Sequence, residues 1–232
     1  MIGGTVAGAG NVISGNGLHG VFLTDPGTTG NRVQGNEIGT DASGLVPVPN
    51  AGAGVFVSNS ASNNTIGAAA AATPTSGPAP GGNLIADNDG KGVVIGFGLA
   101  DNAVGNAFVG NVIFANGGAG GIGIDLGNDG LTANDVADAD TGPNNLQNFP
   151  AISGAALDVN GNLVIDFSLT SLAGTYRVEF FLNNATDVNL PQGRFFLGSM
   201  IVVIANNGDT VSDTVTYVPT LERFTKSWST KS

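Results

Sequence analysis

Short apolar segments recur along residues 11–126, and asparagine or glycine introduces each of them in a fixed order. Residues 11–13 read Asn-Val-Ile, residues 20–23 read Gly-Val-Phe-Leu, and residues 31–33 read Asn-Arg-Val. The same three kinds of segment then return in the same order. β-Branched residues on either side of a small or polar residue are typical of strands. The pattern therefore predicts three short strands in every repeat.

Successive repeats begin at Asn11, Asn36, Asn83 and Asn111, so the repeat lengths are 25, 47 and 28 residues (36 − 11, 83 − 36, 111 − 83). One repeat cannot bury its apolar side chains alone, and the repeats must stack. Strands stacked about 4.8 Å apart predict a right-handed parallel β-helix of about four turns. The long repeat contains two insertions with proline, residues 40–53 and 68–81, which we interpret as surface loops because proline cannot donate in a strand ladder.

The register of this stack has two consequences. The asparagines that begin the repeats should lie above one another and form a hydrogen-bonded ladder. Residues 2–3 resemble residues 66–67, so we expect the chain to enter the stack at the third strand of a repeat. Stacks of this kind normally carry a polar cap, and none is recognisable before residue 11.

The pattern changes after residue 126. Residues 127–150 predict an acidic closing loop, and residues 151–232 alternate apolar and polar positions. Four strands are predicted there, at residues 162–169, 175–183, 194–204 and 210–218. An Ig-like sandwich has about seven strands, so this small antiparallel β-sandwich looks short of strands and would expose an unpaired edge. The predicted class is all-β, with domains at residues 1–126 and 151–232 and a linker at 127–150.

Composition excludes several classes of function. The chain has 232 residues and a net charge of −11, and residues 1–150 contribute −9 of it, from eleven acidic residues against Arg32 and Lys91. The absence of a basic stripe excludes a nucleic-acid-binding class. The absence of cysteine excludes disulfides and thiolate chemistry. No apolar run reaches the roughly 18 residues that predict a membrane span.

Several segments resemble a known family. Gly-Asn-Val-Ile-Ser-Gly-Asn at residues 10–16 and Asn-Asn-Thr-Ile-Gly at residues 63–67 resemble the repeats of large bacterial right-handed parallel β-helix proteins of the secreted or surface type, as do residues 30–41. Residues 123–130 and 138–150 are similar to the segment that ends such a helix. The resemblance implies an Ig-like sandwich after the helix and an extracellular or cell-surface location, without a common activity. The closing strand of that sandwich is not recognisable in residues 219–232.

The acidic loop is the best candidate metal site. Its carboxylates belong to Asp129, Asp135, Asp138 and Asp140. Asp-x-Asp-x-Gly places two carboxylates on one side of a tight loop, and Ca²⁺ takes six to eight oxygen ligands from such groups. The spacing departs from an EF-hand. The alternative is a solvated acidic loop with Asx turns.

Catalytic groups are sparse. Glycoside hydrolysis needs two carboxylates, and Asp87, Asp89 and Asp101 form the closest acidic group near the strands. Elimination from an acidic sugar needs a cationic base, and Arg32 and Lys91 fall on different strands of the repeat. His19 is the single histidine, at a strand entry, and is interpreted as a turn or surface residue. Most phenylalanines before residue 150 occupy strand positions that indicate core.

Three functions remain open. The leading hypothesis is a non-catalytic extracellular structural or adhesive protein, which self-associates into filaments through open stack ends or through strand complementation. The alternative is a carbohydrate-active enzyme or binding module of the polysaccharide lyase or hydrolase type. A third is a fragment of a larger adhesin. The expected partners are copies of the chain and a polysaccharide or cell surface, with no nucleic acid and no membrane span.

Overall fold

The structure is a computed structural model that describes residues 1–68, 80–118, 121–184 and 192–218. Strands dominate these residues, and their helical segments are short 3-10 turns, among them η2 (Val136–Asp138) and η3 (Pro143–Leu146). None of the described helices has the length and apolarity needed to cross a bilayer. The all-β prediction is confirmed.

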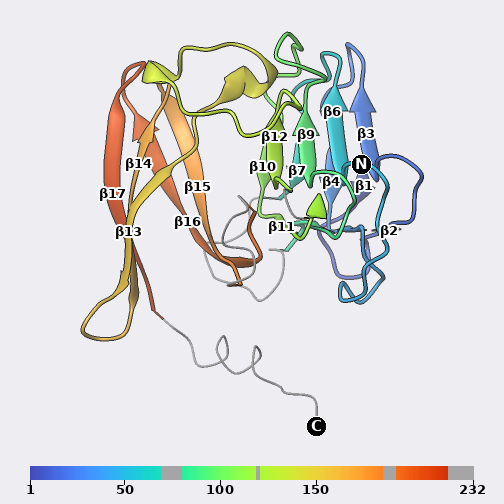
Figure 1. The fold of residues 1–232 in the computed structure, drawn as a ribbon, viewed down its shortest axis with the longest axis horizontal. Helices are drawn as coiled ribbons and strands as arrows, with labels where there is room; N and C mark the ends of the chain where they lie inside the picture. Colours follow the sequence, from blue (N-terminus) through green and yellow to red (C-terminus); the bar gives the residue numbers. More distant parts are fainter. Residues whose placement is uncertain (69–79, 119–120, 185–191, 219–232) are drawn as a thin grey trace. The chain divides into compact units, whose positions relative to one another are not determined.

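Twelve short strands form three parallel sheets of four strands (Figure 1). One sheet, sheet A, contains β1 (Ile2–Gly3), β4 (Arg32–Gln34), β7 (Thr65–Gly67) and β10 (Ala107–Val109). Sheet B contains β2 (Val12–Ile13), β5 (Glu37–Ile38), β8 (Leu84–Ala86) and β11 (Val112–Phe114). Sheet C contains β3 (Val21–Thr24), β6 (Val55–Ser58), β9 (Val93–Ile95) and β12 (Ile124–Leu126).

Each sheet takes one strand from every repeat, as the sequence pattern predicts. The strands β1 and β4 pair in parallel, so the chain enters sheet A, the third position of a repeat. This arrangement is consistent with a β-helix-like fold. The end formed by β1, β2 and β3 is called the N-terminal end of the stack below, and the end formed by β10, β11 and β12 its C-terminal end.

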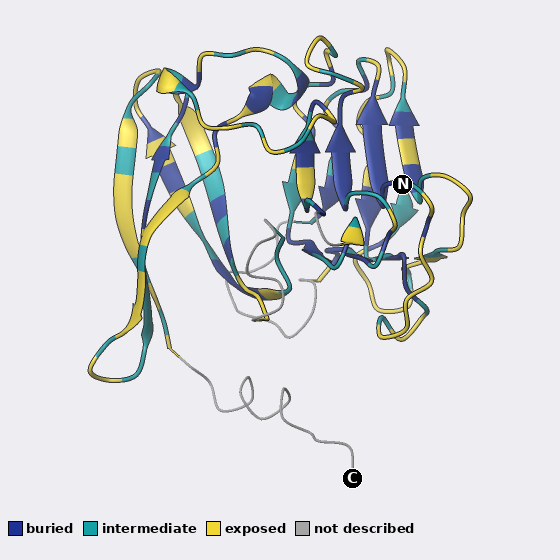
Figure 2. Ribbon diagram, in the orientation of Figure 1, coloured by how far each residue is buried: buried dark blue, intermediate teal, exposed yellow. Residues whose placement is uncertain are grey.

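The register explains the core. In sheet C, Val21, Val55 and Val93 are aligned, and two positions later Leu23, Val57 and Ile95 are aligned. All six side chains are buried, and they form one cluster with inward residues of the other sheets, among them Ile66 and Ile85. Figure 2 shows the inner strands β6 and β9 buried along their length, whereas β3 is partly exposed. Stacking therefore supplies the burial that one repeat lacks.

Asparagine ladders hold the corners of the stack. In the predicted ladder, the backbone N–H and the Nδ2 of Asn36 both donate to Oδ1 of Asn83, at 3.0 and 2.9 Å. Asn83 repeats the same two bonds to Asn111. Two further ladders were not predicted. They contain Asn16, Asn50, Asn88 and Asn116, and Asn31, Asn64 and Asn106.

Asn50 corrects one detail of the sequence interpretation. It lies within residues 40–53, which were interpreted as a surface loop, yet its side chain is fully buried as a ladder member. The exposed part of this insertion is shorter, and Leu45 at its tip is 83% exposed. The second predicted insertion, 68–81, falls mostly outside the described residues.

The described residues of the C-terminal segment form five strands, whereas four were predicted. The sheet β13-β14-β17 is antiparallel and contains β13 (Ala151–Leu157), β14 (Leu163–Thr170) and β17 (Thr210–Tyr217). A second sheet pairs β15 (Gly174–Leu182) with β16 (Phe195–Ile204). The four predicted strands are present within two residues at each end, and β13 is additional. Residues 219–232, in which the sequence shows no recognisable closing strand, lie outside the described residues.

Contacts divide the chain into two compact units, and neither unit is one continuous stretch. The first contains Met1–Ala133, Asp140–Gln147 and Glu179–Leu197. The second contains Asn134–Ala139, Asn148–Val178 and Gly198–Ser232. The first unit thus includes the strand stack and two segments from later in the sequence. Whether residues 1–126 and 151–232 fold as separate domains stays a prediction.

The ladder yields a stability prediction. Asn83 is fully buried, and its side chain also donates to the Val33 carbonyl. Asn83→Ala removes these bonds and leaves the donors of Asn36 without an acceptor, which should lower the free energy of unfolding by roughly 3 kcal/mol. Asn11→Ala is the matched control, because Asn11 is exposed and donates at one end of the same ladder. It should cost at most about 1 kcal/mol. Urea unfolding measures both, and equal losses would contradict the ladder's role.

Candidate functional site

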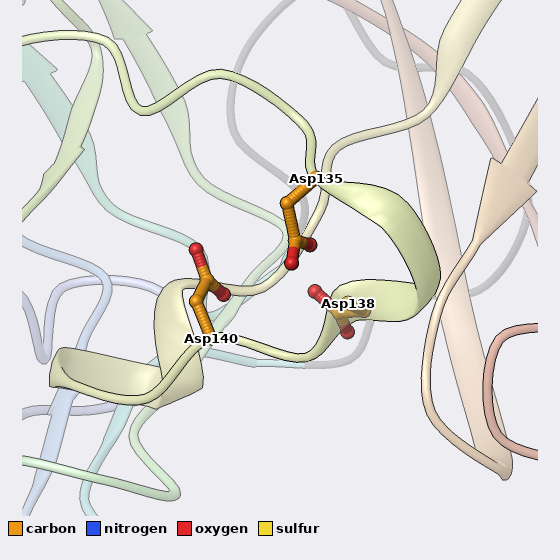
Figure 3. A group of neighbouring side chains, drawn as sticks. All are labelled: Asp135, Asp138 and Asp140. Atoms are coloured by element: carbon orange, nitrogen blue, oxygen red, sulfur yellow. The ribbon is translucent and has the colours of Figure 1, made fainter.

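Three of the four predicted metal-site carboxylates converge. One oxygen each from Asp135, Asp138 and Asp140 lies within 4.8 Å of the others, and Figure 3 shows the side chains pointing toward one another. Among the described residues this is the one group of three or more acidic or histidine side chains that could hold a metal ion. Asp129 is exposed in the turn after β12 and is not part of the group.

Asp138 anchors its loop to the antiparallel sheet of the second unit. Its side chain is buried, with 2% exposed. Its Oδ1 accepts from the Asn148 N–H at 2.7 Å, and its Oδ2 accepts from the Ser171 hydroxyl, which follows β14. Asp138 has a positive φ of 54°, a conformation that aspartate adopts more readily than most residues. Protein donors therefore satisfy much of this carboxylate without an ion.

Asp135 is less completely satisfied. Its Oδ2 accepts from the Ala139 N–H at 3.1 Å, which closes the loop around η2. Its Oδ1 is buried and accepts no hydrogen bond from the described residues. Burying a carboxylate oxygen without a partner is costly. A hard cation held by the three carboxylates would supply that partner, so the group can bind a metal ion.

The candidate hydrolase carboxylates have structural roles. Asp101 accepts four backbone N–H groups, from Asn59, Ser60, Phe97 and Ala103, at 2.7 to 3.1 Å. Burial opposes ionisation, but these hydrogen bonds prevail and lower the pKa of Asp101 below its ordinary value. Burial raises the pKa of Asp87, partly offset by the positive charge of Arg194. Within the described residues, Asp87, Asp89 and Asp101 do not form a converging group.

The two cations of the stack are also separated. Arg32 lies on β4 of sheet A, and Lys91 precedes β9 of sheet C. Lys91 forms an ion pair with Asp125 at 2.5 Å, and the Asp125 side chain is fully buried. This pair was not predicted, because its members belong to adjacent repeats and only the register brings them together. Lys91 therefore holds the last strand of sheet C rather than a substrate.

An aromatic group on the outer face of sheet C was missed. The phenylalanines at strand positions were interpreted as core residues. This is confirmed for Phe56, which is buried in a second apolar cluster with Ala53 and Val94, and wrong for Phe22, whose ring contacts that of Phe56 from the exposed side. The rings of His19 and Phe97 lie 4.5 and 5.2 Å from the ring of Phe56. Phe22 and Phe97 are 45% and 68% exposed. The Ala53 N–H donates to Nδ1 of His19, and burial lowers the pKa of this histidine.

Asp101 gives a pH-dependent prediction. A lowered carboxyl pKa stabilises the fold above about pH 4, the unfolded value, and this stabilisation is lost as the pH falls through the folded value. Asp101→Asn should therefore destabilise the chain by roughly 1 to 2 kcal/mol at pH 7, and by less at pH 2. Urea unfolding at both pH values measures this. The control Asp89→Asn changes an exposed carboxylate of the same stack, and a loss as large as that of Asp101→Asn would contradict the assignment.

The comparisons with known proteins identify no family for this chain. No protein-family model, curated protein or solved structure matches the chain. The functional argument therefore depends on the residues described above.

Proposed function

We propose that this chain is a non-catalytic, extracellular structural protein that associates with copies of itself through the ends of its strand stack. In this proposal the stack is a right-handed parallel β-helix, and adhesion to a cell surface is a second consequence of the same shape. The observation that carries the proposal is the N-terminal end of the stack. There β1, β2 and β3 each form the edge of a sheet, with no neighbouring strand among the described residues.

The side chains at this end support the same proposal. Asn11, Asn16 and Asn31 donate into the three ladders, but no described residue donates to their own side-chain oxygens. Exposed apolar residues lie beside them, and Val12 and Leu18 are 48% and 61% exposed. Edge strands of this kind pair readily with another chain. A contact that repeats from copy to copy without closing builds a filament.

We propose that the chain is non-catalytic because its charged side chains bind other parts of the fold. Asp101 holds four backbone N–H groups, Lys91 holds Asp125, and Asp138 holds Asn148 and Ser171. These groups are committed to the fold and are not arranged about a common substrate position. The alternative, a carbohydrate-binding module, is favoured by one observation, the exposed rings of Phe22 and Phe97 on sheet C.

Self-association has a direct test. Val12→Pro removes a backbone N–H from the edge strand β2, where proline is tolerated. The apparent association constant, measured by sedimentation equilibrium and light scattering, should fall at least tenfold. Val159→Pro is the matched control, because Val159 is fully exposed in the turn between β13 and β14. Equal association of the two variants would contradict a role for the N-terminal end.

Calcium is the ion that we propose for Asp135, Asp138 and Asp140, because the ligands are hard oxygens. Ligand binding to the folded state stabilises it by about 2.7 kcal/mol at a hundredfold excess over Kd. Added Ca²⁺ should therefore raise the Tm by several degrees, as calorimetry would measure. Asp135→Asn with Asp140→Asn should abolish the rise, whereas Asp129→Asn should retain it. These variants keep Asp138, which the loop needs for its anchor. An unchanged Tm on adding Ca²⁺ or a chelator would refute the assignment.

A further inference from the structure

We propose that Asn144, Glu179 and Gln192 form a cap on the C-terminal end of the stack, and that a second copy of the chain binds this end when the cap leaves. The inference rests on the proposed self-association and specifies the surface that the N-terminal end recognises. All the residues involved belong to the first compact unit.

The three cap residues occupy the three corners at the C-terminal end. Asn144 accepts the Asn106 N–H at 3.0 Å and continues that ladder. Gln192 accepts the Asn116 N–H at 3.1 Å and continues the second ladder with a different residue type. At the third corner, both carboxylate oxygens of Glu179 lie 3.0 Å from the Gly110 nitrogen, next to Asn111.

Backbone bonds complete the cap along sheet B. The Ile113 N–H of β11 donates to the Gly193 carbonyl at 2.9 Å, and the Gly193 N–H donates back to the Ile113 carbonyl at 2.7 Å. The Arg194 guanidinium lies 3.8 Å from the centre of the Phe114 ring. Residues 192–194 thus take the place that the next strand of sheet B would occupy.

The polarity of the ladders determines what can replace the cap. At every step from one ladder asparagine to the next, Nδ2 donates toward the C-terminal end and Oδ1 accepts from the N-terminal side. The C-terminal end therefore presents donors, and each cap residue meets them with an acceptor oxygen. The N-terminal end presents the acceptor oxygens of Asn11 and Asn16, whereas Asn31 precedes β4, which pairs with the edge strand β1.

A second copy fits because two corners of its N-terminal end, those before the edge strands β2 and β3, carry the complementary groups. Its Asn11 and Asn16 oxygens match the donors of Asn111 and Asn116, and its β2 continues sheet B beyond β11. Two N-terminal ends do not match, because acceptors would face acceptors. Head-to-tail stacking is therefore the favoured contact, and the cap competes with it for the same backbone groups.

The cap side chains can be truncated without changing the apolar core. Glu179 and Gln192 are only partly buried, and neither contributes to the main apolar cluster. The test uses the full chain with Asn144→Ala, Glu179→Ala and Gln192→Ala. The matched control, Asp89→Ala, Asn102→Ala and Gln147→Ala, removes one carboxylate and two carboxamides from exposed positions. Circular dichroism and urea unfolding verify that both proteins remain folded.

Two measurements follow. Hydrogen exchange should show the Ile113 amide exchanging at least tenfold faster in the cap variant, while the Val112 amide, which is bonded to the Asn83 carbonyl, keeps its rate. Sedimentation and electron microscopy should show at least tenfold stronger association of the cap variant than of the control, and adding Val12→Pro to the cap variant should reverse it.

The outcomes separate this inference from the proposed function. In one outcome the Ile113 amide exchanges faster in the cap variant, but the variant associates no more strongly than the control, and its association still depends on Val12. This result overturns the idea that the cap competes with a second copy. It leaves the proposed self-association standing. An unchanged Ile113 exchange rate overturns the cap itself. A folded cap variant that stays monomeric at every concentration, like the unaltered chain, overturns the proposed self-association together with this inference.

Discussion

The structure depends on one interaction, the side-chain amide of asparagine bridging two adjacent repeats. In the bridges from Asn36 to Asn83 and from Asn83 to Asn111, the N–H and Nδ2 of one residue both donate to the Oδ1 of the next, so two donors share one buried acceptor. The chain must turn sharply between short strands, and turns leave backbone groups without partners. Because buried polar groups need hydrogen bonds, the ladders make compact corners compatible with a core of aliphatic side chains.

Several charged side chains also connect neighbouring loops or strands. Asp101 accepts N–H groups from a loop of the preceding repeat and from its own loop, and Asp138 accepts the Asn148 N–H and the Ser171 hydroxyl. Lys91 and Asp125 join the last two strands of sheet C. Because the strands of the stack are only two to four residues long, strand pairing alone satisfies few backbone groups. Carboxylates accept hydrogen bonds from the backbone of the loops between the strands.

The sequence predicted the stack better than it predicted the surfaces. The order of Asn-led and Gly-led segments identified all three sheets, and Asn36 and Asn83 aligned as expected. Asn50 was missed because prolines on its N-terminal side made its segment look like a loop. Phe22 was interpreted as a core residue although it is 45% exposed, since alternation shows that neighbours point apart but not which one points inward.

For the candidate sites, the sequence predicted a group of residues that are close in the chain but not the contacts between distant segments. Spacing alone brought Asp135, Asp138 and Asp140 together, because they lie within one short loop. The Lys91–Asp125 pair and the cap residues could not be predicted, since their partners are 34 or more residues away in sequence. Glu179 and Gln192 carry no repeat signature, and only the fold places them at the end of the stack. Strand β13 was not predicted, and the first strand predicted in this segment begins at residue 162.

The common direction of the ladders has an electrostatic consequence. Every bridging carboxamide is a dipole, and in all three columns these dipoles point the same way, so their fields add along the stack as peptide dipoles do in an α-helix. The C-terminal end, rich in N–H groups, becomes the positive pole, and the carboxylate of Glu179 sits there. The opposite pole is negative and should attract cations, most strongly at low ionic strength.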